Sequence, residues 1–199
     1  MATDPPRRGL AVVISGPSGV GKTTICRRLL DEYGYEHSVS ATTREPRPGE
    51  RNGADYWFLS AEEFKAKLRR GELLEHSEHF GHMYGTPARP VREAIAEGRT
   101  ILLEIDVNGA KQLMESLPEA YFIFITAPDA GEQARRLRGR HTESEASIRT
   151  RLQRTDMEIA SEMRYNHRVV NRDLDQAAAE VHSLIQKAEA EKTHEGGKA

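Results

Sequence analysis

A run of eight residues near the N-terminus has the types and spacing of a phosphate-binding loop. Residues 16–23 read Gly-Pro-Ser-Gly-Val-Gly-Lys-Thr, which fits the pattern G-x-x-x-x-G-K-[ST]. Glycines let backbone N–H groups converge on phosphate oxygens without clashes from a Cβ atom. Lys22 can reach the β- and γ-phosphates, and the Thr23 hydroxyl can bind Mg²⁺. The segment predicts a site for a nucleoside triphosphate with its magnesium ion.

The residues on either side of this loop support that interpretation. The apolar run Leu10–Ser15 predicts a buried strand, and apolar residues after Thr23 recur at helical spacing. A helix that begins at the loop adds the partial positive charge of its N-terminus to the phosphate site. A chance glycine-rich turn would lack both flanking elements. The residues expected to contact the nucleotide are Gly16, Pro17, Ser18, Gly19, Val20, Gly21, Lys22, Thr23 and Thr24.

Length and composition limit the classes of protein to consider. A chain of 199 residues that is 37% hydrophobic is long enough for one α/β domain. The 29 Lys and Arg residues nearly balance 31 Asp and Glu residues, so we expect no nucleic-acid partner and no membrane partner. The single cysteine, Cys26, suits a reducing compartment and reads as a small core residue. Without an apolar span or a secretory signal we expect a cytoplasmic protein, either a monomer or a homo-oligomer.

Apolar runs further along the chain predict the rest of the fold. Residues 100–105, 121–126 and 168–170 are strand candidates, with stretches of helical character between them. This alternation is typical of a parallel sheet with helices on both faces. From Leu174 an apolar stripe of helical period predicts a final helix. We expect a core of residues 10–37 and 91–190, with disordered tails at 1–9 and 191–199.

Two segments differ from this core in composition. Residues 38–90 are rich in Gly, Pro, aromatic and charged residues and predict a small, strand-rich insert, with the aromatics of 56–58 as its own core. Within it, Arg44 and Arg47 flank a proline, and guanidinium groups bind phosphate bidentately. A solvated basic loop is the alternative for this pair. A basic, polar stretch from about residue 135 to 155 predicts an exposed helical flap.

In combination, these motifs resemble those of the guanylate kinases, which convert GMP and ATP to GDP and ADP. The resemblance spans residues 10–188 and includes the loop, Ser-Ala-Thr-Thr-Arg-Glu-Pro-Arg at 40–47, Asn-Gly-Ala-Asp-Tyr-Trp-Phe at 52–58 and Val-Asn-Arg-Asp-Leu-Asp at 170–175. It implies an α/β fold with a P-loop kinase core, whose parallel sheet is flanked by helices. It also implies that residues 38–90 form a GMP-binding insert and that residues 136–155 form a helical lid.

The resemblance assigns the acceptor site to residues of the insert and its surroundings. Those implied to bind GMP, or dGMP as a second acceptor, are Ser40, Arg44, Arg47, Tyr56, Glu75, Tyr84, Thr86, Glu104 and Asp106. The two arginines and two tyrosines would hold the phosphate, while Glu75 would accept from guanine N1–H and the 2-amino group. Ser40, Thr86 and Asp106 would add contacts to the base. Without the resemblance, an exposed carboxylate at a helix end would be the simpler interpretation of Glu75.

It also assigns the groups that act on the transferred phosphoryl group. The catalytic residues implied are Lys22, Arg44, Arg140 and Arg151, with Arg136 as an outer candidate. Thr23 and Glu104 would bind Mg²⁺, the carboxylate through water, and Asn171 would contact adenine. His141 stands where the family more often has glycine, which affects the local geometry of the lid.

Two other functional classes compete with this kinase. Guanylate-kinase-like scaffold domains bind phosphorylated partners, but Lys22, Thr23 and Glu104 favour a working triphosphate site. The second alternative is a kinase for another nucleoside monophosphate. Ser40, Glu75 and Asp106, which the resemblance assigns to the guanine base, argue against it. His76, His79 and His82 do not have the spacing of a zinc site, so we interpret them as surface histidines.

The loop generates the first prediction. Replacing Lys22 by alanine should abolish most phosphoryl transfer and leave the fold intact, because its charge stabilises the bridging phosphate oxygens. A coupled assay of ADP release, together with a circular dichroism spectrum, measures both effects. A folded Lys22→Ala protein with undiminished transfer would refute the assignment.

Overall fold

The central sheet is parallel and follows the predicted alternation of strands and helices. The computed structural model describes residues 9–79, 81–139 and 165–195. Five strands lie in the order β2-β7-β1-β8-β9, and every neighbouring pair is parallel. Their bounds are Leu10–Ser15 (β1), Glu36–His37 (β2), Thr100–Glu104 (β7), Tyr121–Thr126 (β8) and His167–Val170 (β9). Two predicted bounds are wrong by one residue, because β7 ends at Glu104 and β9 begins at His167.

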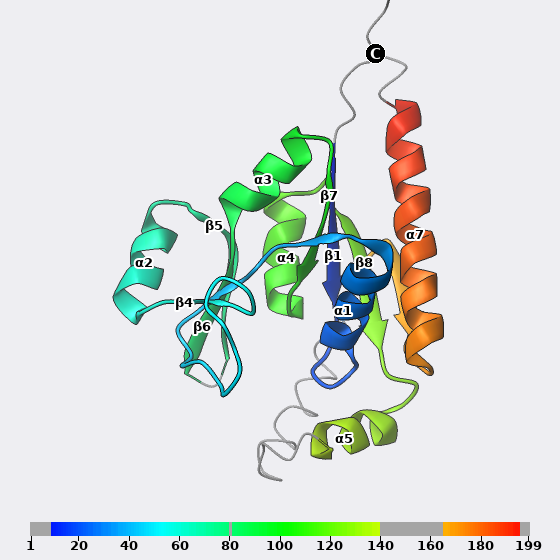
Figure 1. The fold of residues 1–199 in the computed structure, drawn as a ribbon, viewed down its shortest axis with the longest axis horizontal. Coiled ribbons are helices and arrows are strands. Elements are labelled where there is room, and N and C mark those ends of the chain that lie inside the picture. The colour runs from blue at the N-terminus through cyan, green and yellow to red at the C-terminus, as the bar shows by residue number, and fades with distance from the viewer. Residues whose placement is uncertain (1–8, 80, 140–164, 196–199) are drawn as a thin grey trace, which may run out of the picture.

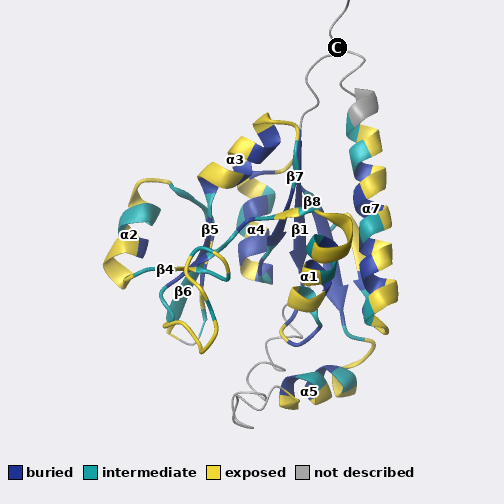
Figure 2. Ribbon diagram, in the orientation of Figure 1, coloured by how far each residue is buried: buried dark blue, intermediate teal, exposed yellow. Residues whose placement is uncertain are grey.

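Helices cover both faces of this sheet, because successive residues of each strand point to opposite sides. On β1, Val12 and Ile14 belong to one buried cluster, which includes residues of α1 (Lys22–Tyr33) and α7 (Leu174–Glu195). Ala11 and Val13 belong to the other, with α3 (Ala88–Ala96) and α4 (Val107–Ser116). Figure 1 shows the two pairs of helices on opposite sides of the sheet, and Figure 2 shows that its inner strands β7, β1 and β8 are mostly buried. Cys26 lies in the first cluster, as predicted.

A second sheet lies within residues 38–90. Its order is β4-β3-β6-β5, with bounds Trp57–Phe58 (β4), Ala41–Thr42 (β3), His82–Pro87 (β6) and Leu73–His79 (β5). The β3–β4 pair is parallel and the others are antiparallel. Helix α2 (Ala61–Arg69) packs here through the buried Phe64. Helix α3 begins at Ala88 and packs on the central sheet, so residue 90 lies inside that helix.

The aromatics of residues 56–58 do not form a core together, contrary to the prediction. Trp57 is 43% exposed, whereas Tyr56 and Phe58 are half-buried with ring centroids 5.9 Å apart. Alternate residues of an extended segment share a face, so Tyr56 and Phe58 pack together while Trp57 points the other way. Among the aromatics that the structure describes in this region, Phe64 on α2 is fully buried.

The last helix is longer than predicted. Helix α7 continues to Glu195, past residue 191 where we expected a tail to begin. Ala190, Glu191 and Lys192 favour helix, which explains the continuation. Lys192 Nζ also donates to the carbonyl of Gly9 at 3.5 Å, beside the start of β1.

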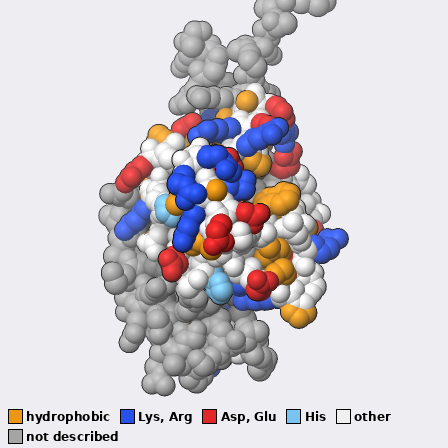
Figure 3. Space-filling model, turned by 90° about the vertical axis from the view of Figure 1, so that its left-hand side faces the viewer, with side chains coloured by type: hydrophobic (Ala, Val, Ile, Leu, Met, Phe, Trp, Pro, Cys, Tyr) orange, Lys and Arg blue, Asp and Glu red, His pale blue; other side chains and the backbone are white. Residues whose placement is uncertain are grey.

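Charges of both signs are mixed over the face that carries the second sheet and α2, as Figure 3 shows. Charged side chains of residues 61–96 form ion pairs, such as Lys67 with Glu72 at 3.0 Å and Arg89 with Glu93 at 2.6 Å. Within residues 9–79, 81–139 and 165–195, no helix combines the length and the apolar character that crossing a membrane requires.

Helix α2 generates a prediction about stability. Ser60 Oγ accepts from Glu63 N–H at 3.2 Å, and Glu63 Oε2 accepts from Ser60 N–H at 2.8 Å, which forms a capping box. Losing this cap in Ser60→Ala should lower the free energy of unfolding by about 1 kcal/mol. The matched control is Ser183→Ala on the exposed face of α7, which removes no cap and should be neutral or slightly stabilising. Urea titrations of both variants measure the difference, and equal stabilities would contradict the capping role.

Candidate active site

The glycine-rich loop joins β1 to α1, as predicted. Gly21 precedes the helix with φ of +100°, a conformation that residues with a Cβ atom rarely adopt. Lys22 Nζ donates to the carbonyls of Gly16 and Pro17 at 2.5 and 2.9 Å. The ammonium group therefore lies across the first part of the loop, beside the groups predicted to bind phosphates.

Thr23 and Glu104 lie together at the first turn of α1. The Thr23 hydroxyl donates to Glu104 Oε1 at 2.6 Å, and Glu104 is the last residue of β7. Hard oxygen ligands of this kind suit Mg²⁺, which proteins bind with few side chains and several waters or phosphates. No group of three or more His, Cys, Asp or Glu residues suitable for a metal occurs in the part of the chain that the structure describes. The Thr23–Glu104 pair is compatible with a magnesium ion that nucleotide and water also coordinate.

Arg44 lies among the aromatics of the second sheet. Its guanidinium carbon is 5.5 Å from the centroid of the Tyr56 ring, and the Tyr56 and Tyr84 rings are 6.1 Å apart. Partial burial opposes its charge, but bonds to Glu50 and Tyr84 outweigh burial and raise the pKa of Arg44. Three of the four residues predicted to bind the acceptor phosphate therefore lie together.

Glu50, which the sequence analysis did not single out, connects the two arginines. Its Oε1 accepts from Arg44 Nη2 at 2.9 Å, and its Oε2 accepts from the backbone N–H of Arg47 at 2.8 Å. The Arg47 side chain itself is exposed. The sequence could have indicated this contact, because Glu50 follows Arg47 by three residues and a carboxylate can accept from a backbone N–H three residues away.

Glu75 is buried on strand β5, which excludes the interpretation as an exposed carboxylate at a helix end. It is 4% exposed, and the Thr86 hydroxyl on β6 donates to its Oε1 at 2.7 Å. Burial raises the pKa of Glu75 to about 7, although the Thr86 bond partly opposes this effect. A Cβ atom on Gly109 would overlap Glu75 Oε2, so the start of α4 packs directly on the carboxylate. Glu75 and Thr86 are brought together as predicted.

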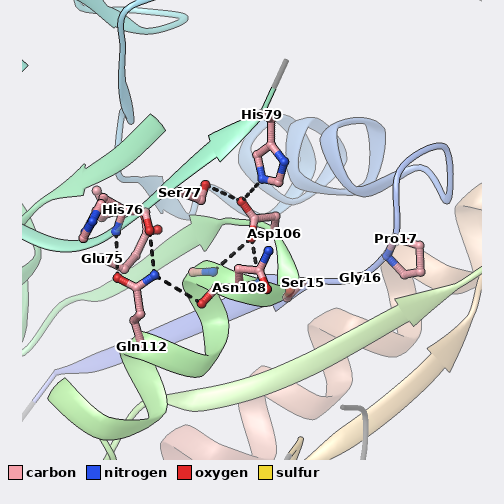
Figure 4. A network of polar contacts seen from close by, with 12 residues as sticks. Ser15, Gly16, Pro17, Glu75, His76, Ser77, His79, Asp106, Asn108 and Gln112 are labelled. Carbon is pink, nitrogen blue, oxygen red and sulfur yellow. Dashed lines mark hydrogen bonds and ion pairs between the residues drawn. The ribbon is translucent and has the colours of Figure 1, made fainter. Parts of the chain in front are cut away.

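Asp106 accepts four hydrogen bonds (Figure 4). It is the N-cap of α4, where its Oδ1 accepts from the N–H groups of Asn108 and Gly109 at 2.7 and 2.9 Å. Its Oδ2 accepts from Ser77 Oγ and His79 Nε2 on β5, each at 2.6 Å. Burial favours the neutral acid, but these donors outweigh it and hold the pKa of Asp106 at about 2. Asp106 is therefore an ionised carboxylate that joins β5 to the end of β7.

His79 is not a surface histidine, contrary to the prediction. Its side chain is 20% exposed and pairs with Asp106. The sequence around His79 gives no signal for this partner, which lies 27 residues away along the chain. Ser77, also missed by the sequence analysis, is 9% exposed and holds the same carboxylate oxygen.

The remaining predicted residues fall into two groups. Ser40 precedes β3, and its carbonyl accepts from the N–H of Trp57 at 2.9 Å. Asn171 follows β9 and is 3% exposed, and its Nδ2 donates to the Val20 carbonyl at 2.8 Å, which places it against the glycine loop. Arg140, His141 and Arg151, with most of the predicted lid, lie outside the described residues.

Comparisons with known proteins agree on one family. The family model described as guanylate kinase matches residues 8–188. The guanylate kinase of Lactobacillus acidophilus is 46% identical over 180 residues, which cover 89% of this chain and 88% of that protein. That of Thermosynechococcus vestitus is 45% identical over 186 residues, covering 93% and 97%. The crystal structure of guanylate kinase from Anaplasma phagocytophilum superposes with a TM-score of 0.77 at 33% identity, covering 92% of this chain and 87% of that one.

The buried Glu75 predicts how stability depends on pH. Its pKa rises from 4.5 in the unfolded chain to about 7 in the fold, so folding favours the protonated acid. The stability that this provides is fully present below pH 4.5 and is lost as the pH rises through about 7. The gap between the two values corresponds to a loss on the order of 3 kcal/mol.

Glu75→Gln, which stays neutral, should remove this component of the pH dependence. Urea unfolding of both proteins between pH 5 and 8 measures it as the difference between two curves. Glu78→Gln, an exposed position on the same strand, is the matched control and should follow the original protein. Parallel curves for the original protein and Glu75→Gln would contradict the raised pKa.

Proposed function

The chain belongs to the guanylate kinase family and phosphorylates GMP to GDP with ATP, and we propose how its residues divide this work. In this proposal the glycine loop and Lys22 bind the triphosphate of ATP, and the second sheet binds GMP. The observation that carries it is the pairing of a phosphate loop on one sheet with a buried carboxylate, Glu75, on the other. A site with one anion-binding half and one hydrogen-bonding half fits a donor and a base-specific acceptor.

The chemistry needs charge stabilisation rather than a general base. The phosphate of GMP is the nucleophile and is already anionic, so no proton has to be removed from it. The site must hold two anions in line and offset their repulsion. We propose that Lys22 acts on the donor phosphates and that Arg44, with Arg47, Tyr56 and Tyr84, holds the acceptor phosphate. Arg140 and Arg151 complete the set of catalytic residues in this proposal.

The residues at the first turn of α1 fit a magnesium ion. We propose that the Thr23 hydroxyl binds it directly and that Glu104 acts through a bound water. When bound, Mg²⁺ neutralises charge on the β- and γ-phosphate oxygens. The 2.6 Å bond between Thr23 and Glu104 supports the pairing, because both oxygens then face one small region.

Base recognition is assigned to Glu75 and its neighbours. Guanine presents N1–H and the 2-amino group as adjacent donors, which match the two oxygens of one carboxylate. Guanine thereby supplies donors that the buried Glu75 lacks. Thr86 contacts the base beside it, and Ser40 and Asp106 complete the pocket, Asp106 by fixing β5 through Ser77 and His79.

Further assignments extend the proposal to the predicted segments. Residues 38–90 are the GMP-binding insert, and residues 136–155 are the lid. Asn171 lies on the ATP side of the site, next to the loop. We include dGMP as a second acceptor, because no proposed contact depends on the 2′-hydroxyl. An assay of ADP release with GMP, dGMP, AMP, CMP and UMP tests the set, and equal rates with AMP and GMP would reject it.

Glu75 generates a prediction about specificity. AMP has an acceptor at N1 and no 2-amino group, so it would leave the buried carboxylate unpaired, and discrimination of about 10⁴-fold is expected. Glu75→Gln replaces an acceptor by a donor that faces a guanine N–H. Its kcat/KM for GMP should fall on the order of 100-fold while the KM for ATP changes little.

Glu78→Gln is the control, since Glu78 is exposed on the same strand. Its kinetics with GMP and ATP should match those of the original protein. Unchanged GMP kinetics in Glu75→Gln would show that Glu75 does not recognise the base.

A further inference from the structure

Three side chains outside the glycine loop hold its outer face. Gln133 Nε2, on α5 (Ala130–Arg138), donates to the carbonyl of Ser18 at 2.8 Å. Asn171 Nδ2 and Arg136 Nη1 both donate to the carbonyl of Val20, at 2.8 and 3.3 Å. The side chains of Gln133 and Asn171 are buried, at 4% and 3% exposed, and the Asn171–Val20 bond is buried with them. We call Gln133, Arg136 and Asn171 the loop clamp.

The clamp fixes the direction of two peptide groups. In a trans peptide the C=O of one residue and the N–H of the next point in opposite directions. Since the Ser18 carbonyl points to Gln133, the N–H of Gly19 points away from α5. Since the Val20 carbonyl points to Asn171 and Arg136, the N–H of Gly21 points away from them. Neither N–H donates to another group among the described residues.

Close packing keeps the loop in this orientation. A Cβ atom on Gly19 would lie 2.7 Å from Leu137 Cγ on α5, and one on Gly21 would overlap Asn171 Nδ2. Both glycines have positive φ, +83° and +100°. The backbone therefore packs on α5 at Gly19 and on Asn171 at Gly21, which leaves its peptide groups no room to turn outward.

Arg136 also connects helix α5, which carries Gln133, to Asn171. Its Nε donates to Glu132 on the same helix at 2.6 Å, and its Nη2 donates to the carbonyl of Asn171 at 2.9 Å. The guanidinium group is thus held by one carboxylate and two backbone carbonyls. These contacts give Arg136 a structural position against the loop.

We propose that Gln133, Arg136 and Asn171 are positioning residues that aim the N–H groups of Gly19 and Gly21 at the donor phosphates. Lys22 binds the carbonyls of Gly16 and Pro17, so it orients a different part of the loop. The inference rests on the proposed ATP site. It adds that phosphate binding by backbone groups depends on side chains far from the motif in sequence, Gln133 being 115 residues from Ser18.

The test compares two variants that each remove one donor. Gln133→Leu keeps the approximate size of the side chain, and Asn171→Ala avoids a clash with Gly21. Each lost hydrogen bond should raise the KM for ATP and the Kd for a non-hydrolysable ATP analogue about fivefold. The KM for GMP should not change. In ¹⁵N-labelled protein, the amide signals of Gly19 and Gly21 should shift in the unliganded variants and respond less to the analogue.

Gln112→Leu is the matched control. Gln112 Nε2 donates to the carbonyl of His76 at 2.6 Å, a bond of the same kind that lies away from the loop. Its loss should leave the affinity for the ATP analogue unchanged. Circular dichroism melting checks the fold of each variant, and if Asn171→Ala does not fold, Gln133→Leu alone decides.

One set of results would overturn the clamp, and another would reject the proposed ATP site. Folded variants with the original ATP affinity and unshifted glycine amides would overturn the clamp, as would equal rises in KM for ATP and GMP. If the analogue fails to perturb the Gly19 and Gly21 amides of the original protein, the proposed ATP site itself is wrong.

Discussion

The two sheets of this protein are joined by the carboxylate of Asp106, and the geometry of the site depends on that junction. A buried carboxylate is stable only when hydrogen bonds replace the water it has lost. Asp106 obtains two donors from the first turn of α4 and two from β5. Because the helix starts directly after β7 and β5 belongs to the second sheet, satisfying one side chain fixes the position of both. Glu104, two residues earlier, faces Thr23, so the same strand end also reaches the donor half.

Asp106 and Glu75 show how neighbouring carboxylates acquire different properties. Asp106 accepts four hydrogen bonds and has a pKa of about 2, whereas Glu75 accepts from Thr86 in a deeper position and has a pKa of about 7. Burial disfavours the charge of both, and the supply of donors separates them. The carboxylate with satisfied bonds is the structural one. Glu75, which has fewer donors than Asp106, is the one suited to a ligand that brings its own, as guanine does with N1–H and the 2-amino group.

Sequence patterns could predict the features that are local in the chain. The loop, its strand and its helix are contiguous, and apolar runs place β1, β7, β8 and β9 to within a residue, whereas the two-residue strand β2 was not predicted. Resemblance to a family supplied Glu75, Thr86 and Asp106, but it did not indicate that Glu75 is buried or that Asp106 caps a helix. His79 and Gln133 gave no signal, since each acts on a partner that only the fold brings near. Trp57 was misjudged because hydrophobicity does not tell which face of a two-residue strand is covered.

In the proposed site, backbone groups bind the phosphates of ATP and side chains recognise the base of GMP, and this difference has a physical reason. Phosphate groups are the same in every nucleoside triphosphate, and backbone N–H groups, which every sequence provides, can bind them once the loop has the right shape. Side chains such as Gln133 and Asn171 then act on the loop from outside rather than on the ligand. A purine base differs from another only in the pattern of donors and acceptors at its edge, which backbone groups cannot be varied to match. In the proposed site, recognition of guanine therefore requires side chains held at fixed depth, and the second sheet, anchored through Asp106, holds Glu75 and Thr86 there.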